Sequence, residues 1–519
     1  MSSVPFTAEP LSTPAADDAC YLALKARDAR FDGRFFTGVT STGIYCRPVC
    51  RVRTPRRENC RFFTLAAQAE QAGFRPCLRC RPELAPAIGT PSDTLRPWSR
   101  QDASQILARQ AAQLLDEPTQ QSADADSATP RMADLAARLG VSERHLRRIF
   151  EAHWGVSPLQ YLQTRRLLMA KRLLTDTSLP VAQIAHLSGF ASVRRFNASF
   201  VEHYRLQPRK LRVQRDTTPA ALGAAAAGAI TLKAAYRPPY DVAAMLDFFA
   251  TRQLDGVESV DTARLTLSRT LALAAGGHTR VGWVRARFVP ARCAVELQVS
   301  PSLMDALPQV LAGLRALLDL DADPLAINAT LHADFPGQDG LRVPGCLDGF
   351  ELAVRAILGQ QITVKAARTL GTRLVERLGE PLAEPVVGLT RLFPAPQVLA
   401  QVDSAWLGEL GIVRQRQRAI QALAQAVCSG SLRLEPGVDI PSTLAALQAL
   451  PGIGAWTAQY IAMRALRWPD AFVAGDVALQ KALGVRDAAN PQQAAEAASQ
   501  RWKPWRSYAV VRGWSLLQK

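Results

Sequence analysis

Cys46-Arg-Pro-Val-Cys50 and Cys77-Leu-Arg-Cys80 are two close cysteine pairs separated by a short stretch of chain. Each pair places two sulfur atoms on one tight turn, so bringing the turns together provides four thiolates. Four thiolates about 2.3 Å from the ion form a tetrahedral Zn²⁺ site. Disulfide bonds are the alternative, but nothing marks the chain as secreted, and cytosolic thiols stay reduced. The stretch therefore predicts a small domain that binds zinc.

Positive charge surrounds the cysteines and dominates the whole chain. Arginines fill the gap between the pairs and two phenylalanines follow the last of them: Arg51, Arg53, Arg56, Arg57, Arg61, Phe62 and Phe63. An acidic partner that touches the metal site is one interpretation, and a solvated basic face is the other. The net charge of +17 and the pI near 9.9 favour nucleic acid or an anionic membrane surface as partner. Cys60 lies inside the run, and we expect it to be a packed side chain rather than a ligand.

The residues around the cysteines are more specific than their spacing. Arg27-Asp-Ala-Arg-Phe-Asp-Gly-Arg-Phe-Phe36, Gly43-Ile-Tyr-Cys-Arg-Pro48 and Arg57-Glu-Asn59 resemble the N-terminal zinc domain of the Ada adaptive-response regulators. The resemblance implies that Cys46 accepts a methyl group from a methylated DNA phosphate. It also implies a small α+β domain in which Zn²⁺ is held by Cys46 with three further ligands: Cys50, Cys77 and Cys80. Methylation lowers the charge of a four-thiolate zinc site from −2 to −1, so less negative charge faces the DNA backbone.

Two helix-turn-helix patterns come next. The first runs from Met132 to Phe150 with its turn at Gly140 and an N-cap at Ser142, and the second runs over 181–200 with an N-cap at Ser192. Residues at helical spacing should face the core: Leu146, Ile149, Phe150, Phe196 and Phe200. The outward residues are then the candidates for DNA contact: Arg144, Arg147, Arg194 and Arg195, with Glu143, Arg148 and Asn197 beside them.

A long amphipathic helix over 158–174 joins the two patterns. Two such units on one rigid connector can enter successive major grooves of DNA. Together with Gly155-Val-Ser-Pro158 and Leu206-Gln-Pro-Arg-Lys210, the arrangement resembles the AraC-type DNA-binding module, although a plain helical packing domain is the alternative. The resemblance implies promoter DNA and RNA polymerase as partners.

Four domains are expected in the 519 residues, over 14–85, 100–213, 229–343 and 344–519. The connecting stretches over 86–99, 117–129 and 215–228 are rich in Pro, in small polar residues and in Ala, respectively. Alternation of Val284, Ala286 and Phe288 with arginines predicts half-buried strands, between helices over 241–252 and 302–318. Beyond residue 345 the apolar periods are helical, which predicts an all-α domain after the mixed α/β one.

The last domain carries Leu450-Pro-Gly-Ile-Gly-Ala-Trp-Thr-Ala458 between two predicted helices. Gly452 and Gly454 let the backbone turn closely, so that its N–H groups can hold a phosphate beside a helix N-terminus. Asp476 follows and also suits the N-cap of a helix. A hairpin followed by such an aspartate resembles the helix-hairpin-helix base-excision glycosylases.

Further matches narrow the resemblance to the AlkA alkylpurine glycosylases: Tyr236-Arg-Pro-Pro-Tyr240, Leu341-Arg-Val-Pro-Gly345, Ala356-Ile-Leu-Gly-Gln360 and Arg501-Trp-Lys-Pro-Trp-Arg-Ser-Tyr508. The resemblance implies that Asp476 stabilises the positive sugar that forms as an alkylated base leaves. It implies an aromatic base pocket, in which π faces favour a cationic base: Trp456, Tyr460 and Trp514. Two positions depart from the family: Val477 replaces a pocket tyrosine, and Gln361 replaces the leucine that wedges DNA.

Trp456 also occupies the place of the Schiff-base lysine of bifunctional relatives, so the sequence predicts base release without strand cleavage. The iron–sulfur cysteine run and the methyltransferase domain that ends an Ada protein, with its Pro-Cys-His-Arg motif, are both absent. Our hypothesis is a sensor of methyl phosphotriesters that activates transcription, fused to a 3-methyladenine glycosylase acting on double-stranded DNA. The alternatives are an enzyme whose zinc and helix-turn-helix parts only tether it to DNA, and a regulator with an inactive glycosylase domain. Without a signal peptide or a membrane-spanning stretch, we expect a cytoplasmic, nucleoid-associated protein.

Overall fold

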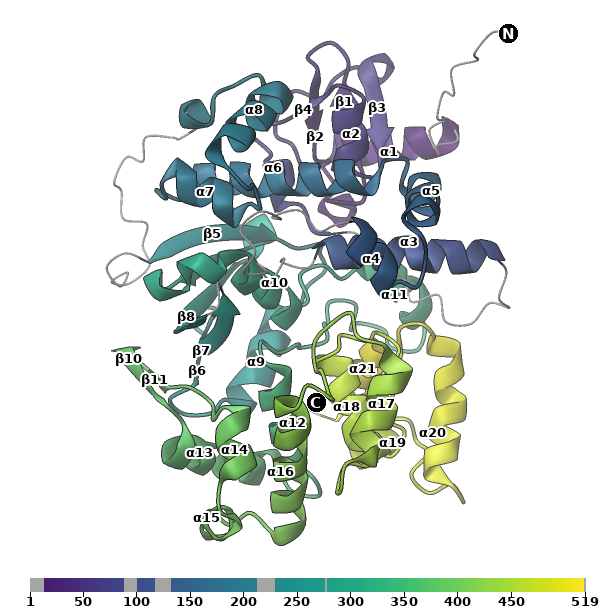
Figure 1. Ribbon diagram of the computed structural model, residues 1–519. Helices are drawn as coiled ribbons and strands as arrows, with labels where there is room; N and C mark the ends of the chain where they lie inside the picture. The colour runs from purple at the N-terminus through teal and green to yellow at the C-terminus, as the bar shows by residue number, and fades with distance from the viewer. Residues whose placement is uncertain (1–13, 88–99, 117–131, 212–228, 276–277, 518–519) are drawn as a thin grey trace. The chain divides into compact units, whose positions relative to one another are not determined.

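The computed structural model describes residues 14–87, 100–116, 132–211, 229–275 and 278–517, which form two compact units (Figure 1). The first unit contains the described residues up to 211 together with 232–237, and the second contains 229–231 and those from 238 onward. β5 (Ile230–Ala235) spans the boundary between the units. The predicted connecting stretches at 86–99, 117–129 and 215–228 lie almost entirely outside the described residues.

A small sheet with the strand order β3-β1-β2-β4 opens the first unit. Its strands are β1 (Phe36–Val39), β2 (Ile44–Cys46), β3 (Cys60–Phe63) and β4 (Arg75–Pro76), accompanied by α1 (Pro14–Ala26) and α2 (Ala66–Gln71). β2 and β4 are parallel neighbours, whereas β1 is antiparallel to both β2 and β3. Parallel strands end at the same edge of a sheet, so Cys46 at the end of β2 lies beside Cys77 just after β4. The N–H of Cys77 donates to the carbonyl of Tyr45 at 2.9 Å.

Six helices complete the first unit: α3 (Arg100–Asp116), α4 (Met132–Arg138), α5 (Glu143–Trp154), α6 (Pro158–Asp176), α7 (Val181–Leu187) and α8 (Val193–Tyr204). The predicted caps are present, since the Ser142 and Ser192 hydroxyls accept from the third N–H of α5 and α8. The turn at Gly140 has a φ of +67°, which favours glycine. All five predicted core residues of α5 and α8 are buried. The double helix-turn-helix is therefore formed as the sequence predicts, with α6 as its connector.

The second unit begins with an antiparallel run of strands in the order β9-β8-β7-β6. These are β6 (Glu258–Asp261), β7 (Thr266–Ala275), β8 (His278–Val289) and β9 (Ala294–Val299), accompanied by α9 (Val242–Arg252), α10 (Leu307–Leu317) and α11 (Pro324–Leu331). Val284, Ala286 and Phe288 are buried, as their alternation predicts. The helix predicted over 302–318 is wrong in its first part, which forms the 3₁₀ helix Pro301–Ala306 before α10 begins. Pro308 explains the break, because proline fits the first turn of α10 but not the interior of a longer helix.

The helical part of the second unit comprises α12 (Gly349–Leu358), α13 (Val364–Leu378), α14 (Pro396–Gln401), α15 (Ser404–Glu409), α16 (Arg414–Cys428), α17 (Ile440–Ala449), α18 (Ala455–Arg464), α19 (Val477–Ala482), α20 (Pro491–Ser499) and α21 (Arg506–Leu516). One large apolar core joins these helices. The expectation of no strands here is wrong, because β10 (Pro381–Val386) and β11 (Leu389–Arg391) form a hairpin around Gly388, whose φ is +81°. Its alternation is too short and too interrupted by proline to stand out in sequence. Across the described residues, no helix has the length and apolarity needed to cross a membrane.

Candidate functional site

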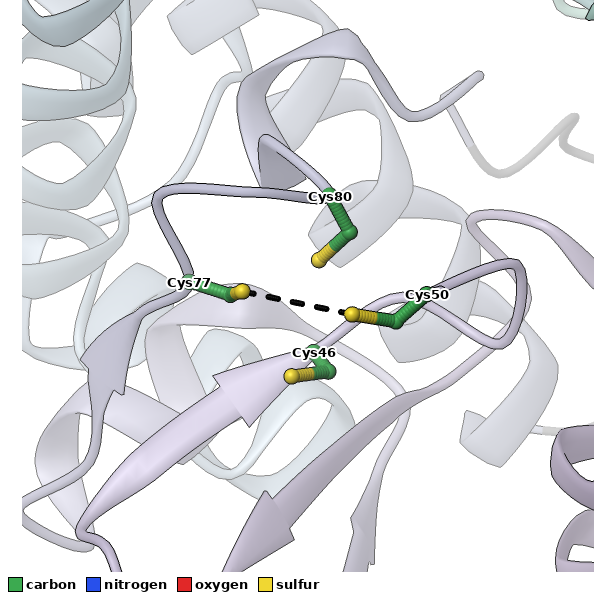
Figure 2. A group of neighbouring side chains, drawn as sticks. All are labelled: Cys46, Cys50, Cys77 and Cys80. Atoms are coloured by element: carbon green, nitrogen blue, oxygen red, sulfur yellow. Dashed lines mark hydrogen bonds between the residues drawn. The ribbon is translucent and has the colours of Figure 1, made fainter. Parts of the chain in front are cut away.

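The four predicted zinc ligands come together at one edge of the small sheet. Figure 2 shows the sulfur atoms of Cys46, Cys50, Cys77 and Cys80 turned toward a common centre. All four sulfurs lie within 4.8 Å of one another, and those of Cys50 and Cys77 are 4.0 Å apart. A tetrahedral site with Zn–S bonds of about 2.3 Å requires sulfurs about 3.8 Å apart. The cluster therefore fits Zn²⁺ in size, number and donor type.

Cys60 stays outside this cluster, as predicted. Its side chain is buried on β3, and its sulfur contacts the carbonyl oxygen of Arg56 at 3.3 Å. The group of four sulfurs does not include it. Burial raises the pKa of the Cys60 thiol, and the nearby Arg57 opposes this only in part. A buried thiol that stays protonated is a poor metal ligand and a poor nucleophile.

Arg47, directly after Cys46, holds the second cysteine pair in place. Its buried guanidinium forms an ion pair with Asp32 and donates to the carbonyl of Cys80 at 2.9 Å. Its backbone N–H points at the sulfur of Cys80 at 3.3 Å. Such N–H···S contacts favour the thiolate form of a cysteine. The sequence analysis did not identify this role, because nothing in the spacing pairs Arg47 with an aspartate fifteen residues earlier.

The arginines between the cysteine pairs form a basic surface next to the metal site. Four of them are exposed: Arg51, Arg53, Arg56 and Arg61. Arg57 differs, because it is half-buried and pairs with Asp17 and Asp18 of α1. The recognition helices α5 and α8 also present exposed arginines, at Arg144, Arg147, Arg194 and Arg195, although Arg147 pairs with Glu151 one turn away. The first unit thus carries exposed positive charge wherever the sequence predicts a DNA contact.

The hairpin between α17 and α18 turns at two glycines. Gly452 has a φ of +78°, and an added Cβ would meet the Ala419 side chain of α16 at 3.1 Å. Gly454 is exposed and precedes α18, and an added Cβ there would meet nothing of the protein within 4 Å. Gly452 is therefore required by the fold, whereas Gly454 leaves the start of α18 open to a ligand.

Asp476 lies at the N-terminus of α19 and lines a cavity of about 470 Å³ together with Trp456, Tyr460 and Trp514. Three donors fix its carboxylate. One oxygen accepts from the backbone N–H of Leu479 at 2.8 Å and from the indole N–H of Trp514 at 3.1 Å, and the other accepts from the indole N–H of Trp456 at 3.0 Å. The two tryptophans therefore orient the carboxylate in addition to lining the cavity, which their positions in the sequence do not reveal.

Aromatic rings line the cavity beside this carboxylate. Trp456 and Tyr460 lie one helical turn apart on α18, and their rings are stacked with centroids 5.4 Å apart. The Arg464 guanidinium donates to the Tyr460 hydroxyl at 2.6 Å. Burial alone raises the pKa of Tyr460, but Arg464 and Arg252 outweigh it, so this pKa lies below its usual value. The cavity thus combines π faces, a fixed anion and guanidinium groups.

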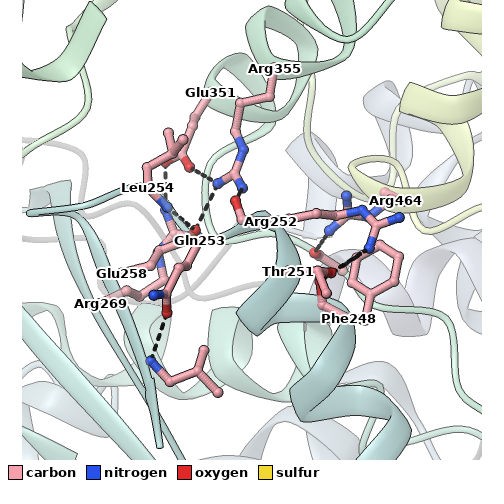
Figure 3. A network of polar contacts seen from close by, with 12 residues as sticks. Phe248, Thr251, Arg252, Gln253, Leu254, Glu258, Arg269, Glu351, Arg355 and Arg464 are labelled. Atoms are coloured by element: carbon pink, nitrogen blue, oxygen red, sulfur yellow. Dashed lines mark hydrogen bonds and ion pairs between the residues drawn. The ribbon is translucent and has the colours of Figure 1, made fainter. Parts of the chain in front are cut away.

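A buried ion network supports one wall of the cavity (Figure 3). Arg269 pairs with Glu258 and Glu351, and Arg355 pairs with the same two carboxylates, at distances of 2.5 to 3.0 Å. Arg355 also donates to the carbonyl of Arg252, at the end of α9. The two carboxylates and the two guanidinium groups cancel in charge. Such neutrality is needed because an unpaired buried charge is costly in free energy. The network fastens α12 to β6 and β7 and positions Arg355 and Arg252 at the cavity.

Gln360 and Gln361 lie at the turn after α12 and have different roles. The Gln360 amide donates to the carbonyl of Gly452 and to the Thr457 hydroxyl, both at 2.9 Å, so it fixes the hairpin. Gln361 is exposed and has a φ of +54°. Gln361, which stands where the resemblance expects leucine, therefore lies in a left-handed turn. Its side chain does not pack into the core. Val477, the other departure, is exposed on the first turn of α19.

These sites define the class of protein: a DNA-binding zinc regulator joined to a helix-hairpin-helix glycosylase. Four family models match successive parts of the chain. They are the metal binding domain of Ada over 19–83, a helix-turn-helix domain over 135–214, the AlkA N-terminal domain over 231–348, and the HhH-GPD superfamily base excision DNA repair protein over 354–507. A probable bifunctional transcriptional activator/DNA repair enzyme AlkA of Mycobacterium tuberculosis (strain CDC 1551 / Oshkosh) is 37% identical over 522 residues, covering 96% of each chain. The chain belongs to this Ada/AlkA family of bifunctional DNA repair enzymes and transcription regulators.

Relatives of the separate halves agree with this assignment. DNA-3-methyladenine glycosylase 2 of Escherichia coli (strain K12) is 37% identical over 279 residues, which is 54% of this chain and 95% of the relative. The bifunctional transcriptional activator/DNA repair enzyme Ada of the same organism is 36% identical over 162 residues, which is 31% of this chain and 39% of the relative. The two matches are to a glycosylase and to an activator that are separate chains in that organism.

Proposed function

We propose that the second unit is a monofunctional glycosylase that flips an alkylated purine such as 3-methyladenine out of DNA and hydrolyses its N-glycosidic bond with Asp476. The supporting observation is the Asp476 carboxylate, which faces the cavity and is fixed by three hydrogen bonds. Within the described part of the chain it has no ion-pair partner. A fixed carboxylate that forms no direct ion pair is suited to stabilise a positive charge on the sugar.

The reaction needs little help at the base. An N-alkylated purine is already cationic, so it departs as a neutral base with the electron pair of the C–N bond. The sugar takes over the positive charge as an oxocarbenium-like ion, which Asp476 stabilises until water adds to C1′ and loses a proton. The stacked rings of Trp456 and Tyr460 hold the extruded base, since a cationic base gains from π faces. The hairpin around Gly452 and Gly454 grips a phosphate, and Gln361 enters the space that the base leaves.

We expect base release without strand breaks, because Trp456 occupies the position of the lyase lysine. Purified protein incubated with methylated DNA should release free 3-methyladenine and leave abasic sites. Borohydride should trap no covalent complex, because imine chemistry lacks an amine at this position. A trapped adduct would identify another amine as nucleophile and make the enzyme bifunctional.

In the first unit, we propose that Cys46 accepts the methyl group of a DNA methyl phosphotriester. Bound Zn²⁺ keeps the cysteine sulfurs deprotonated at neutral pH. The Cys46 sulfur forms a bond to the methyl carbon, and the carbon–oxygen bond to the phosphate breaks. The phosphate keeps that electron pair and regains its negative charge. A triester is uncharged, so an anionic sulfur can approach it more easily than an ordinary phosphate.

Methylation then acts as an electrostatic switch. The largely buried cations near the cysteines are matched by carboxylates: Arg47 with Asp32, Arg81 with Asp176, and Lys171 with Glu83. These buried pairs are neutral as a set, so they do not offset the negative charge of the four-thiolate site. Removing one negative charge about 5 Å from a phosphate is worth about 1.4 kcal/mol after screening, or roughly tenfold in affinity. Arg144, Arg147, Arg194 and Arg195 then hold the promoter while RNA polymerase is engaged.

Two measurements test the switch. Peptide mass mapping after reaction with methyl phosphotriester DNA should place the methyl on Cys46, whereas a methyl on Cys60 would move the acceptor. Promoter affinity should rise after methylation, with a gain that shrinks as salt increases. Equal affinities across a salt series, or a promoter that a methylating agent does not induce, would favour an enzyme whose first unit only tethers it to DNA.

A further inference from the structure

The connector helix of the helix-turn-helix module supplies a lysine to the zinc knuckle, the segment Cys77–Cys80. The ammonium of Lys171 on α6 pairs with Glu83 at 2.5 Å and donates to the carbonyl of Cys77 at 3.3 Å. Both charged side chains are 1% exposed. Lys171 thus reaches a backbone atom of the metal ligand Cys77, although it lies ninety-four residues further along the chain.

A second contact from α6 holds the other end of the knuckle. The Arg81 guanidinium, next to Cys80, binds both carboxylate oxygens of Asp176 at 2.5 and 2.9 Å and also pairs with Glu83. Arg81 has a φ of +55°, in the left-handed region. A bidentate arginine–carboxylate pair fixes orientation as well as distance. The chain on both sides of the knuckle is therefore tied to one helix of the other module.

The Cys46 side of the site is tied to the same helix by a third contact. The side chain of Glu70 on α2 is only 3% exposed, and it accepts from the Tyr45 hydroxyl at 2.9 Å and from the Thr164 hydroxyl of α6 at 2.7 Å. Tyr45 directly precedes Cys46 on β2. Three polar contacts spread along α6, from Thr164 to Asp176, thus reach both segments that supply the metal ligands.

Buried ion pairs of this kind contribute little net stability compared with apolar packing, but losing one partner is costly because the other charge stays buried and unpaired. Their main effect is to fix geometry. We propose that Lys171 is a positioning residue of the metal centre, and that the zinc domain and the helix-turn-helix module hold the metal as one cooperative body. The inference rests on the zinc site and not on methyl transfer.

The first test is the rate of zinc loss from the full-length, zinc-loaded protein. Excess chelator is added, and released zinc is followed with a metal-indicator dye. Lys171→Met should release zinc at least tenfold faster than wild type. The variant removes the hydrogen bond to the Cys77 carbonyl and leaves the Glu83 carboxylate with Arg81 as its remaining ion-pair partner. The double variant Lys171→Met/Glu83→Gln should recover part of the loss. Lys210→Met, an exposed lysine of the same module, is the matched control. Release from Lys171→Met at the control rate would overturn the proposal.

A second test uses only the wild-type protein, so it does not depend on the variants folding. Amide hydrogen exchange is measured with zinc bound and after chelation, with base excision as a check that the second unit stays folded. We expect α6 to lose protection when the metal is removed, together with the zinc domain. Equal protection of α6 in both states would show that the modules are independent and would refute the inference.

Discussion

Replacing Asp476 with asparagine tests the most specific part of the reasoning, because it removes a charge with almost no change in size. The two carboxylate oxygens accept three hydrogen bonds. An asparagine whose single oxygen faces Leu479 and Trp514 keeps two of them, including the helix cap. Its amide group then faces the indole N–H of Trp456, where two donors cannot bond. The lost hydrogen bond costs about 1 kcal/mol, so the fold survives.

The expected loss in catalysis is much larger. A unit negative charge about 4 Å from a positive sugar is worth about 4 kcal/mol at an effective dielectric constant near 20. Asp476→Asn should therefore slow excision roughly a thousandfold. The neutral variant should bind DNA at least as well as wild type, because a negative charge near the backbone is removed.

The assay is single-turnover release of 3-methyladenine from methylated duplex DNA. DNA affinity and the thermal unfolding midpoint are measured on the same preparations. Asp487→Asn is the matched control, because Asp487 is exposed on a loop of the same helical region. Excision by Asp476→Asn within threefold of the wild-type rate would refute the assignment of the catalytic carboxylate. A large loss that also appears in Asp487→Asn would point to instability instead.

The remaining predictions concern both units. Trp456→Phe keeps a ring for stacking but removes the donor to Asp476, so kcat should fall about tenfold with KM nearly unchanged, and a rise in KM alone would assign Trp456 to base stacking only. Metal analysis should find one Zn²⁺ per chain. Chelation should abolish promoter binding while base release from the second unit continues. Loss of both activities would show that base excision depends on the metal. Burial raises the pKa of Glu70 to about 7, against opposing hydrogen bonds from Thr164 and Tyr45. Its stabilising effect is present below the unfolded pKa near 4.5 and is lost as pH rises through 7. Over this whole pH range the free energy of unfolding falls by about 3 kcal/mol, and about 1 kcal/mol of that decrease falls between pH 6 and 8. Urea unfolding of the first unit should show this decline, and Glu70→Gln should remove it; an unchanged slope in the variant would contradict the assignment.

Local sequence determined those parts of the protein whose physics is local. Helix caps, turn glycines and apolar periods act within a few residues, which is why α5 and α8, with their caps at Ser142 and Ser192, follow directly from the chain. The zinc site could also be predicted from the sequence. Each cysteine pair is local, so a single long-range contact between the two turns is enough to bring four ligands together. The two helices that flank the glycine hairpin, α17 and α18, were predictable for the same reason.

Tertiary structure decided every feature that joins residues far apart in the chain. The indole bonds to Asp476 join residues twenty and thirty-eight positions away, and the Lys171–Glu83 pair spans eighty-eight. A lysine on an amphipathic helix ordinarily faces solvent, and only the packing of α6 against the zinc knuckle buries this one. The β10–β11 hairpin escaped prediction likewise, since strand pairing depends on a partner that periodicity within one segment does not specify. Sequence thus determines which groups are available for chemistry. The packed fold decides which of them meet, because a buried charge without an ion-pair partner is costly in free energy.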